Sequence, residues 1–169
     1  MKETATMVLF WDGPFSQWHP SKFFDQNGVL YESAEKYMMA EKARFFNDQI
    51  ALDNIMGSKS PREQKAFGRK VGTYAGADKF DAIKWDAICQ EVVFRGTLFK
   101  FSQNHDLRAH MAASGEKMIV EASPEDRVWG IGLAKEDPRA LDPSKWLGQN
   151  LLGIAIMRVR KLFTENEMM

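Results

Sequence analysis

Glu35 and Lys42 are one pair of side chains whose types and spacing could form part of a catalytic or binding site. They stand seven residues apart in a segment expected to be helical, so they share one helix face about 10 Å apart along the axis. Because Glu35 falls in the first expected turn, the helix dipole favours its ionised form, which can stabilise positive charge developing at a sugar carbon. The spacing fits either a pocket wall that meets a sugar and a phosphate, or a solvated surface face.

The segment 126–132 is the second candidate. It places Asp126, Arg127 and Trp129 within four residues and flanks them with Gly130 and Gly132, and glycines allow a backbone to approach a ligand closely. The tryptophan ring could stack on a base. The same residues also fit an Asp–Arg pair in a loop beside a tryptophan of the core.

Arg69 and Trp85 each have a sufficient structural explanation. Arg69 follows Gly68 near an expected helix C-terminus, where the helix dipole favours a cation whether or not a phosphate is bound. Trp85 falls on the apolar stripe of a long expected helix, together with Val92. From the residues alone, both are interpreted as structural.

Several common kinds of site are absent from the sequence. It contains no Cys-x-x-Cys pair and no His-Glu-x-x-His, so no metal site is expected. It also lacks the glycine-rich motifs of dinucleotide and triphosphate binding and the Gly-x-Ser-x-Gly of serine hydrolases. The sequence therefore predicts neither a metal nor a cofactor, and carboxylates, aromatics and a few cations remain.

The composition is that of an ordinary globular protein. The chain has 169 residues, which suits a single domain over residues 1–169. Its 23 basic and 23 acidic side chains argue against a uniformly basic face that would coat nucleic acid. A single cysteine, no signal-like opening and no apolar run of about 18 residues lead us to expect a cytoplasmic protein without a membrane span.

Apolar periodicity and capping signals predict a predominantly helical α+β fold with a small β-sheet. Ser33 is expected to cap a helix that runs to Phe45, and Ser60 begins a capping box for a helix that ends near Gly72. The other expected elements are strands over 7–11 and 118–122, a hairpin turn at 27–28, helices over 48–56, 81–101, 105–113 and 148–163, and a long loop over 123–143.

Six stretches of the sequence, taken together and in order, resemble the NADAR family, which is also called YbiA-like. The resemblance covers nearly the whole chain. The matching stretches are Phe15-Ser16, Ser33-Ala34-Glu35-Lys36-Tyr37-Met38-Met39-Ala40-Glu41-Lys42-Ala43, Gly68-Arg69-x-Val71, Lys100-Phe101-Ser102-Gln103-Asn104, Val120-Glu121-Ala122-Ser123-Pro124-x-Asp126-Arg127-x-Trp129-Gly130-Ile131-Gly132, and Trp146-x-Gly148-x-Asn150-Leu151-Leu152-Gly153. Gln17 departs from the asparagine that many members have, so it is left out of the expected site.

The resemblance implies hydrolysis of an N-glycosidic bond between a base and a phosphorylated ribose, without metal or cofactor. It implies a small nucleotide-like substrate from one of two groups. One is the ribosylated, phosphorylated aminopyrimidines of early riboflavin synthesis, and the other is ADP-ribose attached to a base such as guanine, a nucleic-acid base included. The resemblance assigns catalytic roles to Glu35 and Asp126 and substrate-binding roles to Lys42, Arg69, Trp85 and Trp129.

These assignments lead to one expected arrangement. Glu35 would face a cleft shared with Asp126 and Trp129, and would stabilise the cationic ribose and orient water. Asp126 would bind the ribose hydroxyls or assist protonation of the base. Two alternatives stay open: a non-catalytic module that binds ADP-ribose or a nucleotide, and a structural protein with a fully buried Trp129.

Overall fold

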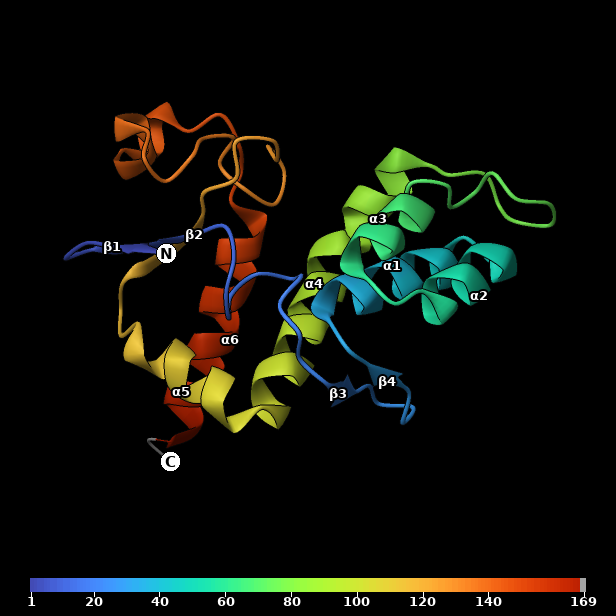
Figure 1. Ribbon diagram of the computed structural model, residues 1–169, viewed down its shortest axis with the longest axis horizontal. Coiled ribbons are helices and arrows are strands. Elements are labelled where there is room, and N and C mark those ends of the chain that lie inside the picture. Colours follow the sequence, from blue (N-terminus) through green and yellow to red (C-terminus); the bar gives the residue numbers. More distant parts are fainter. Residues whose placement is uncertain (168–169) are drawn as a thin grey trace. The chain divides into compact units, whose positions relative to one another are not determined.

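The computed structural model describes residues 1–167, in which four short strands are followed by five helices, a fifth strand, two 3-10 helices and a last long helix (Figure 1). This confirms the predicted helical α+β class with a small sheet. The elements in chain order are β1 (Lys2–Glu3), β2 (Met7–Phe10), β3 (Phe23–Phe24), β4 (Leu30–Tyr31), α1 (Ala34–Phe45), α2 (Gln49–Gly57), α3 (Pro61–Gly68), α4 (Ala82–Gln103), α5 (His105–Ala113), β5 (Met118–Glu121), the 3-10 helices η1 (Pro138–Leu141) and η2 (Pro143–Lys145), and α6 (Leu151–Glu167).

The contacts within the chain gather into two compact units. Unit 1 consists of residues 1–19 together with the chain from Asn104 onward, and unit 2 consists of residues 20–103. The single domain expected over residues 1–169 stays a prediction.

Unit 2 is built around α1, which packs against α2, α3 and α4. The local signals that predicted its helix starts are confirmed: the Ser33 side chain accepts a hydrogen bond from the Lys36 amide, and Ser60 and Glu63 form the predicted capping box. Gly96 lets α4 approach α1 closely, since a Cβ at this position would lie 2.6 Å from the Tyr37 ring. The Ser33 cap therefore fixes the start of α1, and the close approach of Gly96 to Tyr37 fixes its packing against α4.

The prediction that the third helix ends near Gly72 is wrong, because α3 ends at Gly68. The cause is a tertiary contact that the local pattern does not contain. Gly72 adopts a left-handed backbone conformation (φ +84°), and its amide donates to the buried carboxylate of Asp48 at 2.8 Å. Asp48 also caps α2, so one side chain both starts that helix and draws the chain after α3 out of helical geometry.

Unit 1 contains a sheet in the order β1-β2-β5, with β1 antiparallel and β5 parallel to β2. Helix α6 packs against β5. Leu9 of β2, Val120 of β5 and Ile131 of the loop that follows β5 belong to one buried apolar cluster. The expected start of the last helix at Gly148 is wrong, since α6 begins at Leu151 after a left-handed Asn150 (φ +55°). Within residues 1–167, no helix combines the length and the apolar character needed to cross a membrane.

Candidate functional site

Glu35 lies in the first turn of α1 and is only 7% exposed. The cap from Ser33 fixes the start of the helix two residues earlier, so the position of this carboxylate is set by local backbone geometry. A solvated surface face, one of the two arrangements that the spacing allowed, is excluded by this burial. A buried carboxylate in a first helical turn is stabilised in its ionised form by the helix dipole.

Lys42 follows on the same face of α1, and its ammonium group is held by three neighbours. Nζ donates to the Gly68 carbonyl at 2.9 Å and lies over the rings of Phe80 and Trp85, 4.5 Å and 5.8 Å from their centroids. We call these three groups the Lys42 cage. Burial lowers the pKa of Lys42, whereas the negative charge of Glu35 raises it. The two residues are therefore electrostatically coupled, as the shared helix face predicted.

The Gly68-Arg69 pair ends α3 beside this cage. A Cβ on Gly68 would collide with the Met39 side chain of α1, so glycine here lets the two helices touch and brings the Gly68 carbonyl to Lys42. Arg69 is the C-cap residue and is exposed. Within residues 1–167 its guanidinium makes no hydrogen bond or ion pair, so its donors are available to an anion.

Trp85 lies in the first turn of α4 and is 7% exposed. Its burial agrees with the core position that the apolar stripe indicated. Its ring nevertheless lies within reach of the Lys42 ammonium, where a ring face attracts a cation. Trp85 therefore forms one wall of the Lys42 cage in addition to packing in the core.

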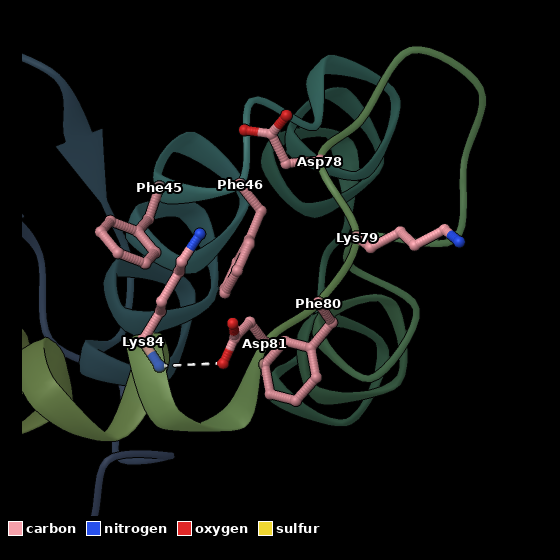
Figure 2. Close-up of a pocket in the computed structure, with 7 residues that line it drawn as sticks. All are labelled: Phe45, Phe46, Asp78, Lys79, Phe80, Asp81 and Lys84. Atoms are coloured by element: carbon pink, nitrogen blue, oxygen red, sulfur yellow. Dashed lines mark hydrogen bonds between the residues drawn. The ribbon is translucent and has the colours of Figure 1, made fainter.

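Phe80 is the residue of the cage that the sequence did not indicate. It ends the loop between α3 and α4, and that loop is tied to the end of α1 by the Asp78 amide, which donates to the Phe46 carbonyl at 2.9 Å. Its ring also contacts Phe46, with the centroids 5.2 Å apart. Figure 2 shows Phe80 and Phe46 close together beside Asp81. Phe46 stands one helical turn after Lys42, and that spacing could have pointed to this region.

In unit 1, Asp126 holds the loop that carries Trp129. One carboxylate oxygen accepts hydrogen bonds from the amides of Val128 and Trp129, at 2.9 Å and 2.8 Å. This oxygen therefore fixes the backbone under the tryptophan, a positioning role that the sequence did not predict. Trp129 is half-buried, which contradicts the fully buried ring expected of a purely structural protein.

The 126–132 loop is fastened to the segment before α6 by backbone hydrogen bonds, among them the one that the Asn150 amide donates to the Gly130 carbonyl at 3.1 Å. The Asn150 side chain ties the same segment to β5, since it accepts from the Glu121 amide at 2.9 Å and donates to the Ile119 carbonyl at 3.0 Å. Gly148 lets the two segments touch, since a Cβ there would lie 2.3 Å from the Gly130 carbonyl oxygen. The Gly148-x-Asn150 stretch seen in the sequence therefore has a structural function, which is to hold the loop of Trp129.

The structure thus places Glu35, Lys42, Arg69 and Trp85 in unit 2 and the pair Asp126 and Trp129 in unit 1. Glu35, Lys42 and Trp85 are brought together, and Arg69 follows the glycine whose carbonyl binds Lys42. A cleft shared by all the candidates stays a prediction. No group of three or more histidine, cysteine, aspartate or glutamate side chains that could hold a metal ion occurs in the part of the chain that the structure describes. The unit 2 group joins one carboxylate to cations and an aromatic wall, a set that can bind a phosphorylated sugar and stabilise positive charge on it.

Comparisons with known proteins agree with this chemistry. The family model described as NADAR domain matches residues 9–164. N-glycosidase R617 of Acanthamoeba polyphaga mimivirus is 40% identical over 151 residues, which cover 87% of this chain and 85% of the relative. Protein irg-1 of Caenorhabditis elegans is 32% identical over 180 residues, covering 97% and 83% of the two chains. The NMR structure of the E. coli protein YbiA matches with a TM-score of 0.76 at 23% identity, covering 99% of this chain and 90% of that one, and supports the fold alone.

The family match includes each residue to which the resemblance assigned a role, from Glu35 to Trp129. The identity to the mimivirus relative extends over most of both chains, so it does not rest on one shared motif. The resemblance seen in the sequence is confirmed, and the chain belongs to the NADAR domain family.

Proposed function

We propose that this chain is an N-glycosidase that hydrolyses the bond between a base and a phosphorylated ribose. The observation that carries the proposal is the pairing of a buried first-turn carboxylate, Glu35, with the caged ammonium of Lys42 on one helix face. The expected enzyme class, a hydrolase of N-glycosyl compounds, is supported by the family membership and by a relative that is named an N-glycosidase.

The reaction needs charge stabilisation at the ribose more than it needs a strong nucleophile. The C1–N bond breaks with its electron pair leaving on the base nitrogen, which takes up a proton. Water then adds to C1 and gives up a proton, so that free base and ribose phosphate result. The ionised Glu35 stabilises the cationic ribose between these steps and orients the water.

The other candidate residues bind the substrate in this proposal. Lys42 and the exposed guanidinium of Arg69 hold phosphate, the arginine through two parallel hydrogen bonds. Trp85 is the aromatic wall behind Lys42, and Trp129 stacks on the base or the ribose. Asp126 binds the ribose hydroxyls or assists protonation of the base with the oxygen that is not engaged by its own loop.

The test is the substitution Glu35→Gln, which keeps the shape of the side chain and removes its charge. Purified protein is incubated with ADP-ribosylated guanosine and with a ribosylaminopyrimidine 5′-phosphate, and the released base is measured by mass spectrometry. We expect wild type to release base from at least one of them and Glu35→Gln to lower kcat by about 10³-fold or more. Near-normal turnover of this variant would contradict the assignment.

Glu63→Gln is the matched control. Glu63 is also a first-turn glutamate, but it belongs to α3 and is exposed, and its task is the capping box, in which glutamine serves as well as glutamate. We expect this variant to retain wild-type turnover. The same incubation tests the alternative function: tight binding of both compounds without release of base would mean a non-catalytic ADP-ribose or nucleotide-binding module.

A further inference from the structure

Gln64 is a buried polar side chain of α3 that the proposed function does not use. Its side-chain oxygen Oε1 accepts a hydrogen bond from the Ser33 hydroxyl, with 3.1 Å between the two oxygens. Both side chains are 3% exposed. A buried polar group costs free energy unless it has a hydrogen-bond partner, so this bond matters to each of them. It joins α3 to the residue that caps α1, 31 positions earlier in the chain.

The Ser33 hydroxyl needs this acceptor in order to cap α1. Its oxygen accepts a hydrogen bond from the Lys36 amide at 3.2 Å, and its one proton must then be donated to another group. Gln64 Oε1 accepts that proton, which fixes the hydroxyl in the rotation that turns a lone pair toward the amide. Removal of this acceptor leaves a buried O–H donor without a partner. The hydroxyl then gains by rotating toward another acceptor, and the cap is weakened.

The first turn of α1 depends on this cap, because the first amides of a helix have no partner within the helix. The first main-chain bond, from the Tyr37 amide to the Ser33 carbonyl, is long at 3.4 Å, compared with the usual length of about 2.9–3.0 Å. The ion pair between Lys36 and Glu32 spans the same turn, but both residues belong to one segment, so it ties the turn to no other helix. The bond from Ser33 to α3 does so.

Gln64 and Gly68 stand four residues apart on α3, which packs against α1 (Figure 1). This spacing places them on the same helix face. Gln64 holds the residue that caps the turn of Glu35, and the Gly68 carbonyl accepts from the Lys42 ammonium at 2.9 Å. The helix α3 therefore supports both members of the pair that carries the proposed function, one through a side chain and the other through the main chain.

We propose that Gln64 is a positioning residue for the hydrolysis: it holds the Ser33 hydroxyl so that the first turn of α1 keeps Glu35 in place. The inference rests on the proposed function, in which Glu35 stabilises the cationic ribose. A displacement of about 1 Å in a group that acts on the transition state can cost about 100-fold in rate. Phosphate binding at Lys42 depends on the main chain of α3 and is independent of the Gln64 side chain.

The substitution Gln64→Met tests this role, because it keeps the length of the side chain and removes the acceptor. We expect kcat for base release to fall about 10-fold or more and KM to stay within about 2-fold of wild type. Thr97→Val is the matched control. Thr97 is also 3% exposed and donates to the Val93 carbonyl within α4, so the control loses a buried hydrogen bond that does not hold α1. Equal losses of kcat in the two variants, or a loss of kcat/KM that comes from KM alone, would overturn the proposal.

A double-mutant cycle with Ser33→Ala separates positioning from a general loss of stability. Alanine at position 33 has no hydroxyl for Gln64 to hold, so adding Gln64→Met to Ser33→Ala should change kcat by less than about 2-fold. Two losses that multiply would mean that Gln64 acts independently of Ser33, and would overturn the proposal.

Hydrogen exchange of the Lys36 amide, measured by NMR, tests the positioning without any turnover. We expect this amide to exchange about 10-fold faster in Gln64→Met and at the wild-type rate in Thr97→Val. Gln64→Glu is the second variant: it keeps an acceptor oxygen for the hydroxyl and should retain the protection of this amide. Unchanged exchange in Gln64→Met, or equal loss of protection in Gln64→Glu, would overturn the proposal. Absence of base release by wild type would refute the proposed function, while the exchange of the Lys36 amide would still test the bond between Gln64 and Ser33.

Discussion

Gly72→Ala should be much more harmful than the same substitution four residues later in the loop, Gly76→Ala. Both glycines have left-handed backbones, with φ of +84° and +82°, so alanine at either position carries a strain of about 1–2 kcal/mol. They differ in their surroundings. A Cβ at Gly72 would lie 2.3 Å from the Phe80 amide nitrogen and 3.0 Å from its Cα, whereas a Cβ at Gly76 has no atom within 4 Å.

The clash at Gly72 is with main-chain atoms, so it cannot be relieved by rotating a side chain. Overpacking of this kind costs about 1–3 kcal/mol. We therefore expect Gly72→Ala to lower the free energy of unfolding by about 2–4 kcal/mol. For Gly76→Ala we expect about 1 kcal/mol, because restriction of the unfolded chain offsets part of the strain. The difference between the two variants measures the contact between residue 72 and Phe80.

Urea unfolding followed by circular dichroism gives both free energies, with equal m-values as the check that only stability has changed. The displaced backbone at Gly72→Ala also moves Phe80 away from Lys42, so kcat/KM should fall in this variant and stay near wild type in Gly76→Ala. If the two variants lose the same stability to within about 0.5 kcal/mol, the close approach of this loop to Phe80 does not constrain the chain, and the argument for a rigid Lys42 cage fails.

Two further predictions concern buried polar groups. Burial lowers the pKa of Lys100 from 10.5 to about 7, so at pH values between these limits the unfolded chain binds a proton that the folded chain does not, and stability rises with pH by about 1.4 kcal/mol per pH unit. Urea unfolding between pH 7 and pH 10 should give a slope that is steeper by about this amount in wild type and in the exposed-residue control Lys70→Met than in Lys100→Met, and equal slopes in all three proteins would contradict the prediction. Asn150→Ala leaves the Glu121 amide and the Ile119 carbonyl without their partner and should lower the free energy of unfolding by about 2–4 kcal/mol; a loss below about 1 kcal/mol would mean that other groups replace these bonds.

The helix starts of unit 2 could be predicted because their signals are local. Ser33, Asp48 and Ser60 each accept a hydrogen bond from an amide three residues later, so the sequence around each cap contains both partners. The end of α3 could not be predicted in this way. It depends on Gly72 reaching Asp48 at the start of another helix, a contact that only the folded chain provides.

The same distinction between local signals and tertiary contacts applies to the residues of the candidate site. Glu35 and Lys42 were predicted as a pair because one helix carries both, and helical spacing is a local property. Phe80 was missed because it joins Lys42 through the fold and belongs to a loop without a periodic pattern. Asn150 appeared in the sequence only as part of a family motif, and its hydrogen bonds to β5 give that motif a structural reason.

The coupling between Glu35 and Lys42 determines how the Glu35→Gln test should be read. Burial lowers the pKa of Lys42 and the charge of Glu35 opposes this, so removing that charge lowers the pKa of the lysine further. Loss of the stabilising carboxylate acts on kcat at every pH. Loss of the lysine proton acts on phosphate binding, and it begins at a lower pH in the variant than in wild type. A KM that rises at lower pH in Glu35→Gln than in wild type would therefore report the state of Lys42, and the kcat measured well below that rise isolates the contribution of Glu35 itself.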